Sequence, residues 1–383
     1  MNKTTKLTIT IFTLALLLIS GCATQTTQTA TQSRENTQDK MLTDKLPIRI
    51  GLILPLTGPS ADFGNLFKES AVMAAEDLNN GGKLNRRVEL VFEDTGGDPK
   101  NAVTAMQKMI NVEGIKLFSS ITSSHALALK PVAVENNVLL FHSAAHPKIN
   151  TGEKMIFGHS NTADDEAATL ARKIIELEAK KAGIIVTNED YGLIFNNELV
   201  KNLEAAGIKT HSELYDPKTN DLRTEVSKAM DGSDTLVIGG FGPGVALAIK
   251  QASELGFNGN KVIGIAFTIQ HLDKLEDLVE GAYYPTYPFT EYKSYPHFVA
   301  SFKKKYGKDP DLFHPVPYGL IETLATAADK AGSDDAEKVA TTLRETGKFE
   351  GAYETLSFNA NQMAKVPLIT SVYHRNGTST PGE

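Results

Sequence analysis

The sequence has a single cysteine among its 383 residues, and it has no tryptophan. One cysteine excludes an intrachain disulfide, whereas the lack of tryptophan excludes nothing. An excess of positive charge is also missing, because 46 acidic residues outweigh 39 Lys and Arg and the net charge is −7. Without a basic field to neutralise phosphates, the chain is not expected to bind nucleic acid.

The N-terminus has the parts of a lipoprotein export signal. Lys3 and Lys6 supply positive charge, and residues 7–19 form an apolar stretch. That stretch is too short to span a membrane comfortably as a permanent helix, so residues 1–21 are predicted to be a signal peptide. Its end resembles the bacterial lipobox, in which small residues precede a cysteine that is lipidated. Because the chain's one cysteine stands there, we expect Cys22 to carry a lipid that anchors an extracytoplasmic protein to a cell membrane, either in the periplasm or on the cell surface.

Residues 22–46 are predicted to be a disordered tether. They are rich in Thr, Gln, Ser, Asn and Asp and contain almost no large apolar side chain, so they cannot bury enough surface to fold. The composition changes abruptly at Pro47, where the folded body begins. Hydrophobic residues make up 41% of the chain and charged residues 22%, which is ordinary for a soluble globular protein. A body of this length favours two lobes.

The body alternates short apolar runs with amphipathic stretches. The predicted strands are 48–54, 88–92, 115–121, 138–141, 183–187, 208–214, 235–239 and 262–265. The predicted helices, from apolar residues at helical spacing, are 63–79, 101–112, 126–135, 166–179, 195–206, 222–229 and 245–255. Continuous apolar strands between amphipathic helices favour parallel sheets covered on both faces. Two such series indicate two doubly wound lobes, which bind ligands beyond the carboxyl ends of their strands.

The residues at those strand ends carry a family resemblance. They are the motifs GLILPLTGP (51–59), ADFG (61–64), NNGG (79–82), ED (93–94), DP (98–99), KP (130–131), LFHSAAHP (140–147) and DYG (190–192). Their order and spacing resemble the leucine/isoleucine/valine-binding family of ABC-transporter solute receptors, which have the type I periplasmic-binding-protein fold. The resemblance runs from about Pro47 to the C-terminus.

The resemblance implies a fold class: α/β, with two doubly wound Rossmann-like lobes joined by three crossover strands. It places residues 47–161 and 290–350 in lobe 1, and residues 162–289 and 351–383 in lobe 2. It also implies a small-molecule ligand held between two hinged lobes and an ABC permease in the membrane as partner. The receptor is expected to be a monomer that needs no cofactor.

The resemblance further implies where a ligand carboxylate is bound. The family serine that binds this group falls at Ser123, with Ser124 beside it, and a loop amide and a hydroxyl can both donate to a carboxylate. A helix N-cap is an equally good interpretation of Ser124. The small-residue loop of the family falls at Ala144, Ala145 and His146.

Aromatic walls are implied at Phe63 in lobe 1 and at Tyr191 in lobe 2, and Phe241 is a further candidate wall residue. The sequence departs from the family where an acid pairs with the ligand ammonium, because that position falls at about Ala266. Either the ligand lacks a free α-ammonium or another acid serves, since a buried ammonium without a partner is costly. The candidate acids are Glu189, Asp190 and Glu291. The two positions of the family disulfide are also occupied by other residues, Gly97 and Thr122.

Three histidines, His125, His142 and His146, are expected near one strand edge of lobe 1. They could form a metal site, add positive charge for an anionic ligand, or be ordinary solvated or core residues. No acidic or cysteine ligand stands among them, which disfavours a metal site, whereas help to an anion remains open.

Three functions stay open at this point: a solute receptor for an ABC permease, a ligand-sensing or partner-activating lipoprotein of the same fold without transport, and a hydrolase. No pair of catalytic carboxylates with a supporting context is present, and residues 158–162 lack the final glycine of a nucleophile elbow. The chain is therefore predicted not to be an enzyme. The tyrosine-rich stretch 283–295 is interpreted as a crossover strand rather than a sugar-binding platform.

Overall fold

A computed structural model of the chain describes residues 45–240, 243–264, 274–374 and 379–381. The predicted signal peptide, Cys22 and all but the last two residues of the predicted tether lie outside these ranges. Within them, no helix combines the length and the apolar character needed to cross a lipid bilayer.

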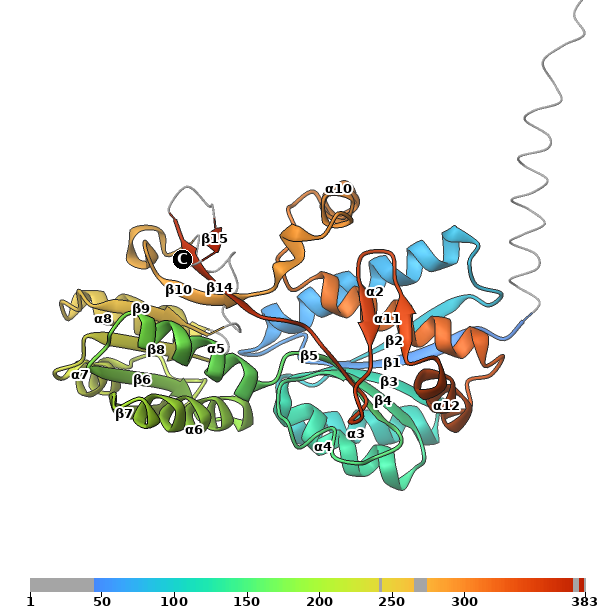
Figure 1. Ribbon diagram of the computed structural model, residues 1–383. Helices are drawn as coiled ribbons and strands as arrows, with labels where there is room; N and C mark the ends of the chain where they lie inside the picture. The colour runs from blue at the N-terminus through green and yellow to red at the C-terminus, as the bar shows by residue number, and fades with distance from the viewer. Residues whose placement is uncertain (1–44, 241–242, 265–273, 375–378, 382–383) are drawn as a thin grey trace, which may run out of the picture. The chain divides into compact units, whose positions relative to one another are not determined.

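The first of the two large sheets is parallel throughout the described residues (Figure 1). Its strands, in spatial order, are β13 (Met363–Lys365), β5 (Ile156–Ser160), β4 (Leu139–Ser143), β3 (Leu117–Ile121), β1 (Ile48–Leu54) and β2 (Val88–Asp94). Each of β3, β4 and β5 is buried along its whole length. This burial explains their continuous apolar runs, because a parallel sheet is covered on both faces.

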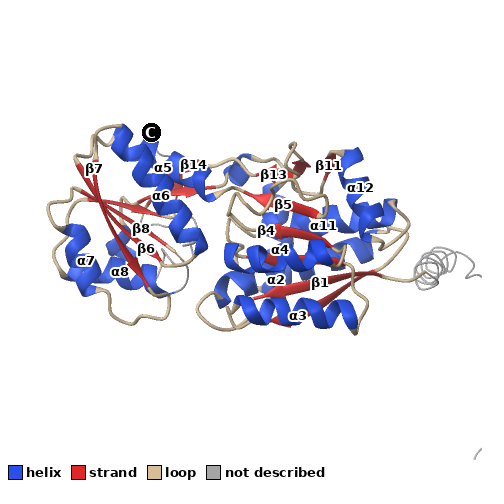
Figure 2. Ribbon diagram, turned by 90° about the horizontal axis from the view of Figure 1, so that it is seen from below, coloured by secondary structure: helices blue, strands red, loops and turns tan. Residues whose placement is uncertain are grey.

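Helices cover both faces of this sheet (Figure 2). One face packs against α2 (Ala61–Gly81), α11 (Pro315–Lys330) and α12 (Ala336–Thr346), and the other against α3 (Pro99–Asn111) and α4 (Ser123–Glu135). Neighbouring residues of β1 divide between the two cores, because successive side chains of a strand point to opposite faces. Leu52 accordingly packs with α2 and α11, and Ile53 with α3 and α4.

The second sheet is parallel in its centre and antiparallel at one edge. Its strands, in spatial order, are β15 (Ser379–Pro381), β14 (Ile369–Tyr373), β10 (Tyr283–Thr286), β9 (Asn260–Ile263), β8 (Thr235–Gly239), β6 (Lys181–Thr187) and β7 (Lys209–Tyr215). One core of this lobe contains α5 (Ala163–Glu176) and α6 (Asp190–Ala205), and the other contains α7 (Arg223–Met230) and α8 (Pro243–Glu254). The two doubly wound α/β lobes predicted from the sequence are therefore confirmed.

The chain passes between the sheets three times, as the resemblance implied. It leaves the first sheet after β5, returns after β10 through the 3-10 helix η2 (Pro288–Glu291), and leaves again between β13 and β14. The remaining elements are the 3-10 helix η1 (Glu276–Val279), α10 (Tyr295–Tyr306) and the hairpin of β11 (Lys348–Glu350) and β12 (Thr355–Ser357).

The expected boundary between lobes at residues 350 and 351 differs from the structure. After the β11–β12 hairpin the chain turns back, and β13 pairs in parallel with β5 at the edge of the first sheet. The third crossing therefore lies at residues 366–368, and 351–365 stay with the first sheet rather than the second.

The first residues of the helices differ more from the sequence predictions than the bounds of the strands do. The predicted strands 48–54 and 235–239 coincide with β1 and β8. In contrast, α4 begins at Ser123 rather than residue 126, and α6 begins at Asp190 rather than residue 195. The predictions began at the first periodic apolar residue, but both first turns carry polar side chains that face the site described next.

Candidate ligand pocket

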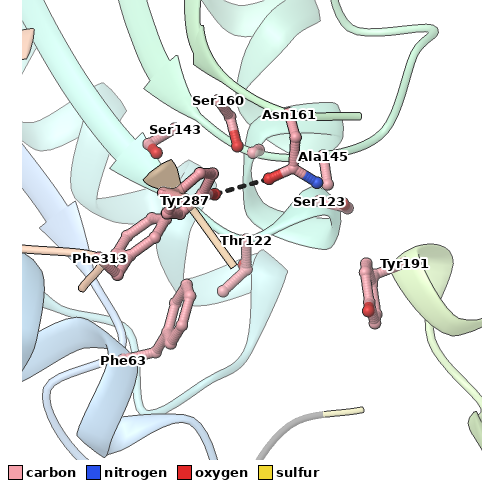
Figure 3. A pocket seen from close by; sticks show the side chains of 11 residues that line it. Phe63, Thr122, Ser123, Ser143, Ala145, Ser160, Asn161, Tyr191, Tyr287 and Phe313 are labelled. Atoms are coloured by element: carbon pink, nitrogen blue, oxygen red, sulfur yellow. Dashed lines mark hydrogen bonds between the residues drawn. The ribbon is translucent and has the colours of Figure 1, made fainter. Parts of the chain in front are cut away.

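A pocket opens where the carboxyl ends of β3, β4 and β5 meet the crossing segments (Figure 3). The empty space in and around it, open solvent included, is about 390 Å³. Its lining residues are Phe63, Thr122, Ser123, Ser143, Ala144, Ala145, Ser160, Asn161, Tyr191, Tyr287 and Phe313.

The polar side of the pocket is built at the N-terminus of α4. The helix begins at Ser123 directly after β3, so its first-turn amides point toward the carboxyl edge of the sheet, where the helix dipole favours an anion. Ser123 is 2% exposed, and its Oγ has no hydrogen-bond partner among the described residues. The register pairs Ile121 with Ser143, whose side chain is 3% exposed and whose Oγ likewise lacks a partner there. Buried hydroxyls of this kind are rare without a partner, and a polar group that enters the pocket can supply one.

Thr122, the residue before α4, has a strained backbone. Its φ is +74° and its ψ is 143°, a conformation that a β-branched residue rarely adopts. Such strain persists only where the surrounding structure imposes it, and it concentrates at functional sites. Thr122 is also the N-cap of α4, so the alternative that Ser124 caps this helix is wrong.

The apolar side of the pocket is a group of three aromatic rings. Phe63 and Phe313 lie 4.8 Å apart between ring centroids, and Phe313 and Tyr287 lie 5.9 Å apart. Phe63 belongs to the first turn of α2, where Gly64 allows the helix to approach the end of β1. A Cβ on Gly64 would lie only 2.1 Å from the carbonyl oxygen of Pro55. These rings can pack against the hydrocarbon part of a ligand.

Two of the crossing segments meet at the pocket. Tyr287, which follows β10, donates a hydrogen bond from its hydroxyl to Oδ1 of Asn161, which follows β5, at 2.6 Å (Figure 3). Both residues are buried and both line the pocket. A ligand here would therefore contact the segments about which the two lobes could hinge.

Tyr191 supplies the side of the pocket that comes from the second lobe. It lies in the first turn of α6, and its hydroxyl donates to Oε1 of Glu166 in α5 at 2.8 Å. Glu166 is 0% exposed. Burial, together with the negative charge of Glu166, holds the pKa of Tyr191 well above its usual value. Gly264, after β9, completes this corner, because a Cβ there would lie 3.1 Å from both Tyr191 Oη and Glu166 Oε1.

Among the described residues, His125, His142 and His146 are not gathered with other possible metal ligands. Within the described ranges, no group of three or more His, Cys, Asp or Glu residues has a geometry that could hold a metal ion. His142 Nε2 lies 2.6 Å from Oδ1 of Asn150, and its Nδ1 accepts from the amide of Ala144. Burial lowers the pKa of His142 to about 4 and also lowers the pKa values of His125 and His146. A positive charge on His146 at neutral pH is therefore disfavoured.

The structure brings five of the eight predicted ligand-binding residues together: Phe63, Ser123, Ala144, Ala145 and Tyr191. Ser124 and His146 do not belong to the lining, and His146 Nδ1 instead accepts from the amide of Lys148. Phe241 and Ala266 lie outside the described residues.

None of the three candidate acids lines the pocket. Glu291 is exposed, and Asp190 is half-buried in the first turn of α6. Glu189 accepts a hydrogen bond from the Thr187 hydroxyl, and burial raises its pKa.

Sequence reasoning missed Thr122, Ser143, Ser160, Asn161, Tyr287 and Phe313, together with Glu166 behind the wall. Ser143 stands inside one of the recognised motifs, between His142 and Ala144. Tyr287 belongs to the tyrosine-rich stretch that was interpreted as structural. Phe313 follows a loop far along the chain, and no local pattern connects it to Phe63.

Comparison with known proteins agrees with this architecture. Residues 47–368 match the family model described as periplasmic binding protein. A leucine-, isoleucine-, valine-, threonine- and alanine-binding protein of Pseudomonas aeruginosa is 29% identical over 352 residues, covering 87% of this chain and 91% of its own length. The crystal structure of a leucine binding protein, LivK, from Thermotoga maritima superposes with a TM-score of 0.80 at 27% identity, covering 88% of this chain and 98% of the other.

A substrate-binding protein of a branched-chain amino acid transporter from Streptococcus pneumoniae, solved with isoleucine, has the same fold. Its TM-score is 0.78 at 20% identity, and the match covers 88% of this chain and 99% of the other. The family match spans the whole first sheet, all three crossings and the strands β6 to β10 of the second sheet. The chain thus belongs to the periplasmic binding protein family, in the leucine/isoleucine/valine-binding group that its strand-end motifs predicted.

Proposed function

We propose that this protein is the extracytoplasmic solute-binding lipoprotein of an ABC importer and that it binds a small carboxylate-bearing ligand with an apolar side chain. Branched-chain amino acids are the leading candidates, since the Pseudomonas relative is named for leucine, isoleucine, valine, threonine and alanine, and the Thermotoga protein for leucine. In this role the protein delivers its ligand to a membrane permease and catalyses no reaction.

The observation that carries this proposal is the buried, unpartnered hydroxyl of Ser123 at the N-terminus of α4. A carboxylate placed there would accept hydrogen bonds from the hydroxyl and from first-turn amides, and it would lie at the positive end of the helix dipole. The aromatic rings of Phe63 and Phe313 face the same cavity and offer an apolar surface for a branched side chain.

Titration calorimetry with three related compounds tests the carboxylate assignment. Leucine is expected to bind, whereas 3-methylbutylamine, which has the same branched side chain and no carboxylate, is expected to show no measurable binding. Loss of two or three charge-assisted hydrogen bonds, worth about 1.5–3 kcal/mol each, accounts for the difference. The keto acid of leucine keeps the carboxylate and is expected to bind measurably. Binding of the amine as tightly as leucine would overturn the assignment, and a panel of apolar amino acids that all fail to bind would remove the proposed ligand class.

The lipid anchor is tested at Cys22. Changing Cys22→Ser removes the thiol that would accept the lipid, so we expect the variant to leave the membrane fraction or to keep its signal peptide. Immunoblotting of fractionated cells measures both outcomes. The variant Thr26→Ala, within the predicted tether, serves as the matched control and should fractionate like the wild type. A Cys22→Ser protein of mature size in the membrane fraction would contradict lipid anchoring.

A further inference from the structure

The loop between α10 and α11, which forms part of the pocket wall, is bonded at both ends to a single residue of α2, Glu69. At the start of the loop, the Tyr306 hydroxyl donates to the main-chain carbonyl oxygen of Glu69 at 2.7 Å, and Lys308 Nζ donates to Oε1 at 2.9 Å. At the end of the loop, His314 Nε2 lies 3.2 Å from Oε2. All three oxygen atoms of one residue thus hold this loop to the helix.

His314 is bonded through both of its ring nitrogens. Its side chain is 2% exposed, and the main-chain amide of Asp311 donates to Nδ1 at 2.8 Å. An amide can donate only to a ring nitrogen that carries no hydrogen, so Nδ1 accepts and Nε2 donates to Glu69. The carbonyl oxygen of Asp311, which is 3.1 Å from Nδ1, accepts instead from the main-chain amide of His314. The imidazole is therefore fixed in one orientation between the loop and α2.

Asp311 passes this fixed position on to Phe313. Asp311 is 5% exposed, and its Oδ1 accepts from the main-chain amide of Phe313 at 2.9 Å. A side chain that bonds the amide two residues further on closes a tight turn, which restricts the backbone there. From this turn the ring of Phe313 reaches the pocket and lies 4.8 Å from that of Phe63 (Figure 3). A continuous chain of hydrogen bonds thus leads from Glu69 to the residue that carries the ring.

Glu69 is suited to anchor this chain of bonds. Burial acts to raise the pKa of its carboxyl group, but hydrogen bonds from His314 and Lys308 outweigh it, so the pKa lies below its usual value. The group is therefore charged at neutral pH, and a charged acceptor makes the stronger hydrogen bond. Glu69 and Phe63 also belong to the same helix. A bond between Glu69 and the loop therefore fixes the distance between the two aromatic rings.

We propose that Glu69, acting through His314, is a positioning residue that holds Phe313 against Phe63 and so fits the apolar wall of the pocket to bulky ligand side chains. Neither Glu69 nor His314 lines the pocket. The effect on affinity rests on the proposed function, because it assumes a ligand with an apolar side chain. If the ring is released, a bulky side chain loses more contact area than a small one, and apolar stabilisation follows the area.

The absence of tryptophan allows a direct test without any ligand, because Phe313→Trp makes position 313 the single indole emitter. In this background, His314→Asn keeps an oxygen near the place of Nδ1 but is too short to reach Glu69. We expect the indole emission to shift to longer wavelength and to become more accessible to iodide, because the ring leaves its buried place. Glu69→Ala removes the other end of the bond and should cause the same shift, which keeps the inference testable if His314→Asn does not fold. Unchanged emission in the folded variants would overturn the inference.

Titration calorimetry on the protein that retains Phe313 measures the effect on affinity. His314→Asn should weaken leucine binding by about three- to tenfold, the value of one aromatic contact, and alanine binding by less. An equal loss for both ligands, or no loss for leucine, would overturn the inference. Wild-type protein that binds neither amino acid would defeat the proposed function, whereas the emission measurement would still decide whether Glu69 positions the ring.

Tyr318→Phe is the matched control. Tyr318 in α11 donates to Oδ2 of Asp77 in α2 at 3.0 Å and is 3% exposed, but it does not line the pocket. Its substitution also removes one hydrogen bond to α2, so it should lower stability without changing the emission of the indole at position 313 or the ratio of leucine to alanine affinity. A shift as large as that of His314→Asn would show that any loosening of α2 moves the ring, and the specific role of Glu69 would be wrong.

Discussion

Replacing His159 by alanine is expected to lower the free energy of unfolding by about 3–5 kcal/mol at pH 7, because it leaves a buried carboxylate without its partner. His159 Nε2 lies 2.8 Å from Oε1 of Glu354, with side chains only 3% and 6% exposed. Its Nδ1 lies 3.0 Å from the carbonyl oxygen of Ala364. Both ring nitrogens thus face acceptors, and only the imidazolium can donate from both. Chemical denaturation followed by circular dichroism measures the loss.

The same pair predicts how stability depends on pH. Burial acts to lower the pKa of His159, but the charge of Glu354 and its hydrogen bond outweigh it, so the pKa is raised above the usual 6.5. A histidine whose pKa is raised on folding contributes stability that is fully present below the unfolded-state pKa and is lost as pH rises through the folded-state pKa. In Glu354→Gln this contribution disappears. The stability difference between wild type and Glu354→Gln should therefore narrow as pH rises above 6.5.

A surface pair provides the control for this prediction. Arg223 and Glu254 lie 2.7 Å apart, but both side chains are more than half exposed. Exposed pairs contribute little to stability, so Glu254→Gln should unfold like the wild type at every pH tested. A difference between wild type and Glu354→Gln that stays constant from pH 6 to 9 would show that His159 is not charged in the folded protein.

Ser123→Ala is expected to weaken leucine binding by about 10–100-fold, the value of a hydrogen bond to a charged group, without destabilising the ligand-free body. The reason is that Ser123 Oγ is buried and has no hydrogen-bond partner among the described residues. Its removal costs the free protein nothing and can stabilise it by about 1 kcal/mol, because a desolvated hydroxyl is eliminated. Calorimetry measures the binding and thermal unfolding the stability.

Ser120→Ala is a control for this prediction three residues away. Ser120 is equally buried, but its hydroxyl donates to the carbonyl oxygen of Ile53 at 2.8 Å and does not line the pocket. Its substitution should lower stability by about 1 kcal/mol and leave leucine affinity close to that of the wild type. If Ser123→Ala gave this pattern instead, the hydroxyl would be structural and the carboxylate would have to bind elsewhere.

The parts of the fold that local pattern determines were predictable. The bounds of β1 followed from a short apolar run between the polar tether and a Pro/Gly turn, and they coincide with the structure. The position of β13 was not predictable, because three residues carry no periodicity and their pairing with β5 is set by tertiary contacts. Likewise α6 begins earlier than its apolar pattern suggests.

The residues of the pocket also divide into those that the sequence could predict and those that it could not. Tyr191 could be predicted because it stands within a strand-end motif, and Ser123 because the family resemblance places a ligand-binding serine after the third predicted strand. The place of Glu166 behind the pocket could not be predicted, since its link to the lining is the hydrogen bond from Tyr191, which is 25 residues away along the chain. Phe313 packs with Phe63 across an even greater separation. Such pairs become visible only when the three crossings are known.

The pairing of β13 with β5 also affects how the chain can fold as it is made. A nascent polypeptide emerges from its N-terminus, and domains that are continuous in sequence can fold in that order. Here the edge of the first sheet beside β5 stays unpaired until residues 363–365 have emerged, so neither lobe can be completed before nearly the whole chain has been synthesised. Exposed strand edges promote association between chains. During that interval the free edge of β5 is open to pairing with a strand of another chain.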